Sequence, residues 1–204
     1  MKKLIIIFFI PFISKSQKNQ IDTVIKTDIY ESHFSKKYSN PIIVKYNLYK
    51  GGGDCDRSKF HFQNDIEIKC NDDKCYKASN YDKGHMANAE DFAYNCTYDE
   101  LTFRYYNCVP QTAELNRGIW KKYEGDIRKT SQNDSLIVIC YNEFKNKRIN
   151  NMFIPDLCYK FVYSLTQKKF IILFSCTNTN NPVTTQISVG DLSKKYNWIY
   201  NFVK

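Results

Sequence analysis

Short runs of β-branched and aromatic residues, separated by polar turns, recur along the chain. Buried strands show this pattern in a sequence. It predicts strands at residues 41–49, 66–69, 135–141, 159–165 and 169–174. Three consecutive glycines at positions 51–53 follow the first run and favour a turn. The runs in the second half of the chain are expected to form a central sheet.

A different spacing, with apolar residues at every fourth position, predicts one helix after Pro110. Thr112 is a suitable N-cap for it. The apolar stripe expected to face the core consists of Leu115, Ile119, Tyr123 and Ile127. One position further along, about 100° around the helix, lies a second stripe, formed by Asn116, Trp120, Glu124 and Arg128. The second stripe is free to face a functional site.

Gly118 lies inside this helix, where glycine costs about 1 kcal/mol relative to alanine. Close approach of another chain segment would explain it, and a tolerated defect is the alternative. Gly118 indicates no function.

The N-terminus is typical of an export signal. Met1-Lys2-Lys3 is a basic start, an apolar run of ten residues follows from Leu4 to Ile13, and small residues stand before Gln17. A membrane anchor is the alternative, but the run is far shorter than the roughly 20 residues that span a bilayer. We therefore expect residues 1–16 to be a cleaved signal peptide, and the mature protein to be secreted, either extracellular or periplasmic, without stable membrane insertion.

The chain is basic, with a formal net charge of +9 that falls to +6 when the three lysines of the signal peptide are removed. Such a charge attracts polyanions, because neutralised phosphates release condensed counterions. It would equally suit an anionic cell surface. Charge therefore favours nucleic acid as a partner without selecting it.

The mature chain contains eight cysteines, at positions 55, 70, 75, 96, 108, 140, 158 and 176. An even number in an exported protein indicates disulfides. A zinc site is disfavoured, since no Cys-x-x-Cys occurs and only three histidines are present. Among the possible pairings only Cys70 with Cys75 is suggested by proximity in sequence.

Candidate chemistry concentrates in Asp82-Lys83-Gly84-His85 and in Asn116, which follows 31 residues after the histidine. A lone histidine is more often structural than catalytic, but this one is followed by the array Asn-x2-Pro-Gln-x4-Asn-x3-Trp-x3-Glu. In order and spacing the two segments resemble the DNA/RNA non-specific endonucleases. These form a branch of the ββα-metal nucleases, with a motif usually written Asp-Arg-Gly-His.

The resemblance covers residues 40–202 and implies an α+β fold. The implied fold is one ββα-metal nuclease domain, built on a central, mainly antiparallel sheet with flanking helices. We assign this domain to residues 40–204 and regard residues 17–39 as an N-terminal extension. No repeat or proline-rich linker argues for a second domain.

By resemblance, neutral His85 is the general base that deprotonates water, and Asn116 is the single direct protein ligand of a Mg²⁺ ion, for which Mn²⁺ could substitute. Mg²⁺ suits such a site because it retains water and prefers oxygen ligands. Glu124 lies eight residues further on, a rise of about 12 Å in a helix, so the resemblance gives it a water-mediated metal contact. Arg128 would bind the transition-state phosphate. The alternative for Glu124 and Arg128 is an ordinary i,i+4 surface ion pair.

Three further residues match the family less specifically. Asn107 corresponds to a family asparagine near the catalytic histidine, so the resemblance implies a catalytic role for it, and Arg57 falls near an arginine that contacts phosphate, which implies substrate binding. Lys83 replaces the usual arginine of the motif, which keeps the charge and loses the bidentate fork. By resemblance it is expected to take part in catalysis and to bind substrate. Gln111 and Trp120 also match and are expected to position the helix.

The sequence as a whole predicts a secreted, Mg²⁺-dependent endonuclease. It would cleave DNA and RNA with little sequence preference and leave 5′-phosphate and 3′-hydroxyl ends, as the family does. Two alternatives are a nuclease toxin delivered to competitor cells and a catalytically weak nucleic-acid-binding module.

Overall fold

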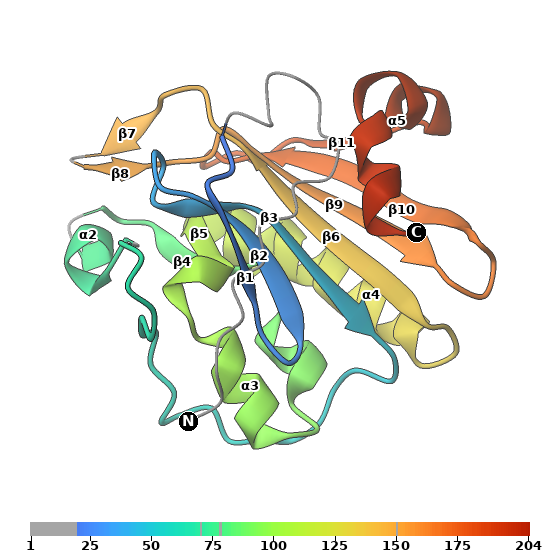
Figure 1. Ribbon diagram of the computed structural model, residues 1–204, viewed down its shortest axis with the longest axis horizontal. Helices are drawn as coiled ribbons and strands as arrows, with labels where there is room; N and C mark the ends of the chain where they lie inside the picture. The colour runs from blue at the N-terminus through green and yellow to red at the C-terminus, as the bar shows by residue number, and fades with distance from the viewer. Residues whose placement is uncertain (1–19, 70, 78, 150) are drawn as a thin grey trace.

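A seven-stranded antiparallel sheet forms the centre of the computed structural model, which describes residues 20–69, 71–77, 79–149 and 151–204 (Figure 1). The expected signal peptide, residues 1–16, lies outside the described residues. In spatial order the strands are β1 (Thr23–Lys26), β2 (Tyr30–Ser35), β3 (Asn40–Leu48), β6 (Leu136–Glu143), β9 (Leu157–Ser164), β10 (Lys169–Thr177) and β11 (Thr184–Gln186).

The middle of the sheet is buried on both faces, which is why its strands are nearly continuous hydrophobic runs. Strands β3, β6 and β9 have almost no exposed positions. These strands and β10 confirm four of the five strand predictions. The α+β fold with a large antiparallel sheet is confirmed as well.

The strand predicted at residues 66–69 is wrong, because this segment is a bend. Ile66 and Ile68 still pack against the core with their side chains. The side-chain amide of Asn64 donates to the carbonyl of Ile68 at 2.9 Å, which closes the chain on itself locally. The alternating apolar residues Ile66 and Ile68 are therefore partly buried here, although the backbone forms no strand.

The boundary expected at residue 40 falls inside the sheet, between β2 and β3. Strand β2 pairs with β3 in antiparallel register from Tyr30 opposite Tyr46 to Ser35 opposite Asn40. Residues 23–35 thus belong to the same sheet as the strands that follow them.

Helices cover both faces of the sheet (Figure 1). Successive residues of β9 point to opposite faces, and Lys160 lies at 4.5 Å from the Trp120 ring on one side, while Phe161 contacts Trp198 on the other. The first side carries the segment η3 (Leu115–Trp120) and α4 (Lys121–Ser131), and the second carries α5 (Val189–Lys195) and η4 (Asn197–Phe202).

A smaller layer lies on the face of the sheet that carries η3 and α4, and it contains the motif Asp82–His85. Its two-stranded ribbon pairs β4 (Asp82–His85) with β5 (Cys108–Gln111). Around it are α2 (Asp73–Lys77), η1 (Ala89–Phe92), α3 (Cys96–Thr102), η2 (Tyr105–Asn107) and the hairpin of β7 (Arg148–Ile149) with β8 (Met152–Phe153). The ribbon followed by the α4 helix gives the ββα arrangement.

The predicted helix is present, but a π-helical turn interrupts it at η3, where Gly118 has non-helical φ and ψ of −99° and −109°. A Cβ at Gly118 would meet no atom within 4 Å, so the expectation that another segment approaches it closely is wrong. The π turn also shifts the buried stripe. Trp120 is fully buried, whereas Tyr123 is partly exposed and stacks on Phe174. The expected division into a core stripe and a site stripe is therefore only partly correct.

One disulfide, Cys55–Cys96, joins residues 41 positions apart in the described chain, with a Cα–Cα distance of 5.4 Å. The general expectation of disulfides is wrong for Cys75, Cys140, Cys158 and Cys176, whose thiols are free. The last three lie on central strands and are buried, where cysteine packs as a small apolar side chain. The suggested pair Cys70–Cys75 involves Cys70, which lies outside the described residues.

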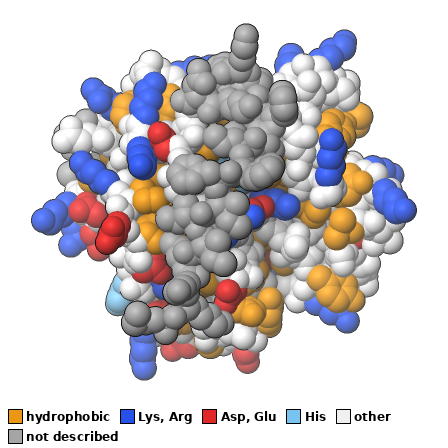
Figure 2. Space-filling view, in the orientation of Figure 1, with side chains coloured by type: hydrophobic (Ala, Val, Ile, Leu, Met, Phe, Trp, Pro, Cys, Tyr) orange, Lys and Arg blue, Asp and Glu red, His pale blue; other side chains and the backbone are white. Residues whose placement is uncertain are grey.

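Lys and Arg side chains are spread around the periphery of the face shown in Figure 2 and do not gather in one patch. None of the helices in the described ranges has the length and apolar character needed to cross a membrane.

Candidate active site

A pocket of about 400 Å³ opens between β4, η1, η3 and α4. Its lining contains five of the seven residues predicted for the site: His85, Asn116, Glu124, Arg128 and Arg57. Residues from a strand, a helix and a distant loop thus meet in one place. Lys83 and Asn107, the other two predicted residues, do not line this pocket.

His85 ends strand β4 with its ring between two aromatic side chains, Phe62 and Phe103, each with its ring centroid 4.8 Å away. Its Nε2 is buried and has no hydrogen-bond partner among the described residues. Burial, with the positive charge of Arg57 as a smaller cause, lowers the pKa of His85 to about 3. The imidazole is therefore neutral around pH 7.

Close packing around the ribbon fixes the position of His85. The indole Nε1 of Trp120 donates to the His85 carbonyl at 3.4 Å. Any side chain at Gly84 would overlap Gln111, because a Cβ there would lie only 2.1 Å from the Gln111 Oε1. The glycine of the motif therefore lets β4 lie against Gln111. Trp120 and Gln111 thus contact the strand that carries the histidine, whereas they were expected to position the helix.

Asn107 is a positioning residue and not part of the pocket wall. It is fully buried. Its Nδ2 donates to the carbonyls of Ala87 and Thr102 at 2.9 and 2.8 Å, and its Oδ1 accepts from the Ala87 amide at 2.9 Å. We therefore correct its predicted catalytic role, because these bonds engage both ends of the amide in fixing the turn after His85.

Asn116 stands at the start of the helix, and its orientation is set by the first residue of the motif. Its Nδ2 donates to the Oδ2 of Asp82 at 3.0 Å, and Arg117 donates to both oxygens of the same carboxylate at 2.8 and 2.7 Å. Burial opposes ionisation of Asp82, but the hydrogen bonds from Arg117 and Asn116 hold its pKa below the ordinary value. The Asn116 Oδ1 receives no hydrogen bond from the described residues, so it remains available as an oxygen ligand.

Glu124 is buried to 6% exposure and pairs with Lys160, whose Nζ lies 3.0 Å from its Oε1. The pKa of Lys160 is raised: burial acts to lower it, and the Glu124 charge more than compensates together with other neighbours. Glu124 and Arg128 make no i,i+4 ion pair with each other, because each has a different partner. The simple surface-pair interpretation of these two residues is therefore wrong.

Arg128 is held by three acceptors on η1 and just before it. Its Nε donates to Asp91 at 2.9 Å, one Nη donates to Asn88 at 3.1 Å, and the other lies 3.4 Å from Glu90. Burial raises the pKa of Asp91 to about 6 against the charge of Arg128, and Tyr46 donates to its other oxygen at 2.9 Å. The guanidinium is thus fixed in the pocket wall before any substrate binds.

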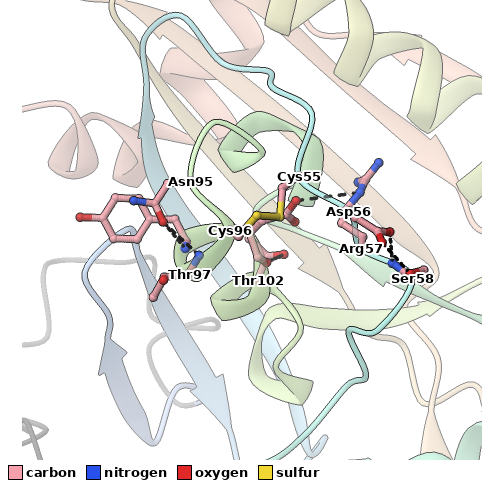
Figure 3. Close-up of a disulfide and its surroundings, with 10 residues drawn as sticks. Cys55, Asp56, Arg57, Ser58, Asn95, Cys96, Thr97 and Thr102 are labelled. Carbon is pink, nitrogen blue, oxygen red and sulfur yellow. Dashed lines mark hydrogen bonds and ion pairs between the residues drawn. A yellow bond between two sulfur atoms is a disulfide. The ribbon is translucent and has the colours of Figure 1, made fainter.

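Arg57 reaches the pocket from the loop that the disulfide ties to α3 (Figure 3). Its side chain is 40% exposed, and its Nε lies 3.9 Å from the Oδ2 of Asp99, which is buried. Burial raises the pKa of Asp99 to about 6 despite the charge of Arg57. The disulfide and Asp99 together keep a partly exposed cation near the pocket, and Asp99 engages only the Nε of its fork.

Lys83 points into a different environment. Its Nζ pairs with Asp73 of α2 and lies within 6 Å of three aromatic ring centroids, those of Phe62, Tyr76 and Tyr105. The replacement of arginine by lysine in the motif thus places the cation in an aromatic cluster that fastens α2 to the ribbon.

The pocket suits a hard metal ion better than a soft one. Oxygen donors are supplied by Asn116, Glu124, Asn88 and Glu90, and the lining contains no cysteine. Among the described residues no group of three or more His, Cys, Asp and Glu could hold a metal. An ion bound here would therefore have few protein ligands and would retain water, as Mg²⁺ does.

Several residues in or around the site were given no role from the sequence, namely Asp82, Asn88, Glu90, Arg117, Lys121 and Lys160. One sequence signal could have identified Lys160, since a lysine between Tyr159 and Phe161 interrupts a strand that is otherwise buried. A charged residue at such a position requires a buried partner. The others stand in or beside the two motif segments, where their spacing alone does not distinguish them from surface residues.

Comparison with known proteins bears on the family and on the fold. The family description "DNA/RNA non-specific endonuclease" matches residues 11–202. A chain in the crystal structure of the EndoG/EndoGI complex, which concerns the mechanism of EndoG inhibition, superimposes with a TM-score of 0.70. It is 19% identical, and the alignment covers 85% of this chain and 83% of that chain, so the two share a fold. No curated protein matches the sequence.

Proposed function

The chain belongs to the DNA/RNA non-specific endonuclease family, and we propose that it is a secreted, Mg²⁺-dependent enzyme that cleaves both nucleic acids internally. Its assignment as a nucleic-acid hydrolase follows from the family. The finer proposal rests on one observation: a neutral histidine and an unengaged asparagine oxygen line the same pocket.

In this proposal His85 is the general base. Its imidazole is neutral at physiological pH and accepts a proton from the water that attacks phosphorus. The flanking rings of Phe62 and Phe103 restrict the imidazole to one orientation. The bond between phosphorus and the 3′ oxygen then breaks, which leaves 5′-phosphate and 3′-hydroxyl ends.

Asn116 would hold the metal through Oδ1, and Glu124 would orient the water around it. A divalent ion bound at these oxygens neutralises charge on the phosphate and on the leaving oxygen. The hydrogen bond from Asn116 to Asp82 keeps the amide nitrogen turned away from the cation. Mn²⁺ would be accepted by the same oxygen ligands.

The pocket cations would bind the phosphate itself. Arg128 is fixed by Asp91 and Asn88, so its position needs little rearrangement as negative charge develops. Arg57 and Lys121 line the outer part of the pocket and would contact the backbone of the strand. Contacts to phosphate carry no sequence information, so we expect weak sequence preference.

Two observations support export. The N-terminal sequence has the pattern of a signal peptide, and the Cys55–Cys96 disulfide is of the kind that persists in oxidising compartments. We therefore propose that the enzyme acts outside the cytoplasm.

The test is cleavage of a plasmid and of an RNA by the purified mature protein, with Mg²⁺ and with EDTA. We expect both substrates to be cut with Mg²⁺, neither with EDTA, and products that carry 5′-phosphates. A protein that binds both nucleic acids and cleaves neither with Mg²⁺ or Mn²⁺ would contradict the proposal.

A further inference from the structure

A fully buried lysine, Lys160, pairs with Glu124, which lines the pocket of the proposed metal site. It stands in the middle of β9, and its side chain has 0% exposure. Across the sheet it faces Cys140 of β6, whose side chain is uncharged and fully buried. Its ammonium group therefore has no access to water and depends on protein partners.

The principal partner is Glu124, whose Oε1 lies 3.0 Å from the Lys160 Nζ. Burying such a pair costs desolvation energy, and apolar residues of the same volume are often equally or more stabilising. The stability of the fold therefore gives no reason to keep a lysine at this position. Its presence indicates that the position of the glutamate matters.

Lys160 also contacts the support of the proposed general base. Its Nζ lies 4.5 Å from the centre of the Trp120 ring, and the Trp120 Nε1 donates to the His85 carbonyl at 3.4 Å. A cation over an indole face is attracted to the ring, and more strongly when both are buried. One ammonium group thus contacts both the carboxylate of the pocket and the indole that holds the histidine strand.

We propose that Lys160 is a positioning residue for catalysis, which anchors Glu124 through Oε1 so that Oε2 faces the water shell of the bound metal. This inference rests on the proposed function, because Glu124 matters only if a metal binds in the pocket. Lys160 touches neither substrate nor metal. It acts through Glu124, and through Trp120 it helps to hold the strand that carries His85.

The test uses Lys160→Met, which keeps an unbranched side chain one atom shorter than lysine and removes its charge. Residues that support metal ligands typically contribute 10- to 100-fold to metal affinity. We therefore expect Mn²⁺ affinity, measured by electron paramagnetic resonance, to fall by about 10-fold or more. The Mg²⁺ concentration for half-maximal cleavage should rise in parallel.

Val162→Ala is the matched control, because Val162 is fully buried two residues along the same strand and its substitution leaves every charge in place. It should lower thermal stability without changing Mn²⁺ affinity. Equal loss of Mn²⁺ affinity in Val162→Ala and Lys160→Met would show that general loosening is responsible, and would overturn the inference.

A second comparison places Lys160→Met in a Glu124→Gln background. If Lys160 acts through Glu124, the added substitution should change Mn²⁺ affinity much less there than in the parent. Independent effects of the two substitutions would contradict this.

Should Lys160→Met fail to fold, Lys160→Gln provides the test, since its amide still donates to Glu124 and an intermediate loss of affinity is expected. Unchanged affinity in Lys160→Gln would then overturn the inference.

The inference and the proposed function fail in different ways. If the unsubstituted protein binds no Mn²⁺ and cleaves nothing, the proposed function is wrong. If it cleaves with Mg²⁺ while Lys160→Met binds Mn²⁺ as tightly as the parent, only the role of Lys160 is wrong.

Discussion

The side-chain Nδ2 of Asn116 donates a hydrogen bond to the Oδ2 of Asp82, at a distance of 3.0 Å. Asp82 begins the strand that ends in His85, and Asn116 lies on the helix packed beside it. The hydrogen bond therefore joins the element that carries the proposed base to the element that carries the proposed metal ligand. It also determines which end of the amide is left for a cation.

Asp82→Ala should weaken metal binding without removing any metal ligand. The Asn116 amide would lose the acceptor that orients it, so we expect the Mg²⁺ concentration for half-maximal cleavage to rise by about 10-fold. Asn116→Ala should have a larger effect, because it removes the ligand itself. Lys122→Ala, which breaks only an exposed ion pair with Asp126, is the control. A parental Mg²⁺ requirement in Asp82→Ala would show that this hydrogen bond does not orient the ligand.

His85→Ala should abolish cleavage while leaving the metal site intact. Loss of a general base typically costs about 10² to 10⁴-fold in rate. Mn²⁺ affinity should remain at the parental value, because Asn116 and Glu124 are unchanged. Single-turnover cleavage and Mn²⁺ binding by electron paramagnetic resonance measure the two properties separately. Near-parental cleavage by a folded His85→Ala variant would place the base elsewhere.

Removal of the Cys55–Cys96 disulfide should affect stability and substrate binding together. Closing a loop of 41 residues stabilises by about 4 kcal/mol in the chain-entropy account. Cys55→Ser with Cys96→Ser should lower the free energy of unfolding by an amount of this order. It should also raise KM, as we expect of Arg57→Ala, because Arg57 is proposed to contact the substrate backbone. Intact mass should fall by about 2 Da when the reduced chain is oxidised, through loss of two thiol hydrogens. If KM remains parental, the disulfide stabilises the fold without positioning Arg57.

The raised pKa of Asp99 should make the stability of the fold depend on pH. Its carboxylate is buried, receives no hydrogen bond within the described chain, and has its pKa raised to about 6. A carboxyl that binds its proton more tightly in the folded state contributes stability below about pH 4, and this contribution is lost as pH rises through about 6. Asp99→Asn should therefore raise Tm above pH 6, and the difference should disappear near pH 4. Identical Tm profiles from pH 4 to 8 would contradict the raised pKa.

Lys83 should contribute more to the attachment of α2 than to catalysis. Its ion pair with Asp73 is partly exposed, so Lys83→Ala should cost on the order of 1 kcal/mol of stability. Cleavage should stay within a few fold of the parent, in contrast with Arg57→Ala. A loss of about 100-fold in kcat with the fold intact would show that Lys83 reaches the transition state after all.

Local sequence determined the strands and the motif elements. Buried strands such as β6 and β9 are recognisable because both of their faces are covered and nearly every position is apolar. The resemblance of the two motif segments to the family placed His85 and Asn116 in one site, and both residues line the same pocket. Alternation failed at residues 66–69, where a local hydrogen bond from Asn64 favours a bend.

The tertiary structure alone decided which charged and polar groups meet. Lys160 and Glu124 are 36 residues apart, and the disulfide joins cysteines 41 residues apart, so no local pattern specifies either pair. The burial of Asn107 and the aromatic surroundings of Lys83 likewise arise from packing between distant segments. The spacing of residues in the sequence indicates which of them can lie on the same face of a strand or a helix. The partners of a buried charge depend on how those faces pack, because a low-dielectric interior requires each charge to be compensated by whichever group the fold brings next to it.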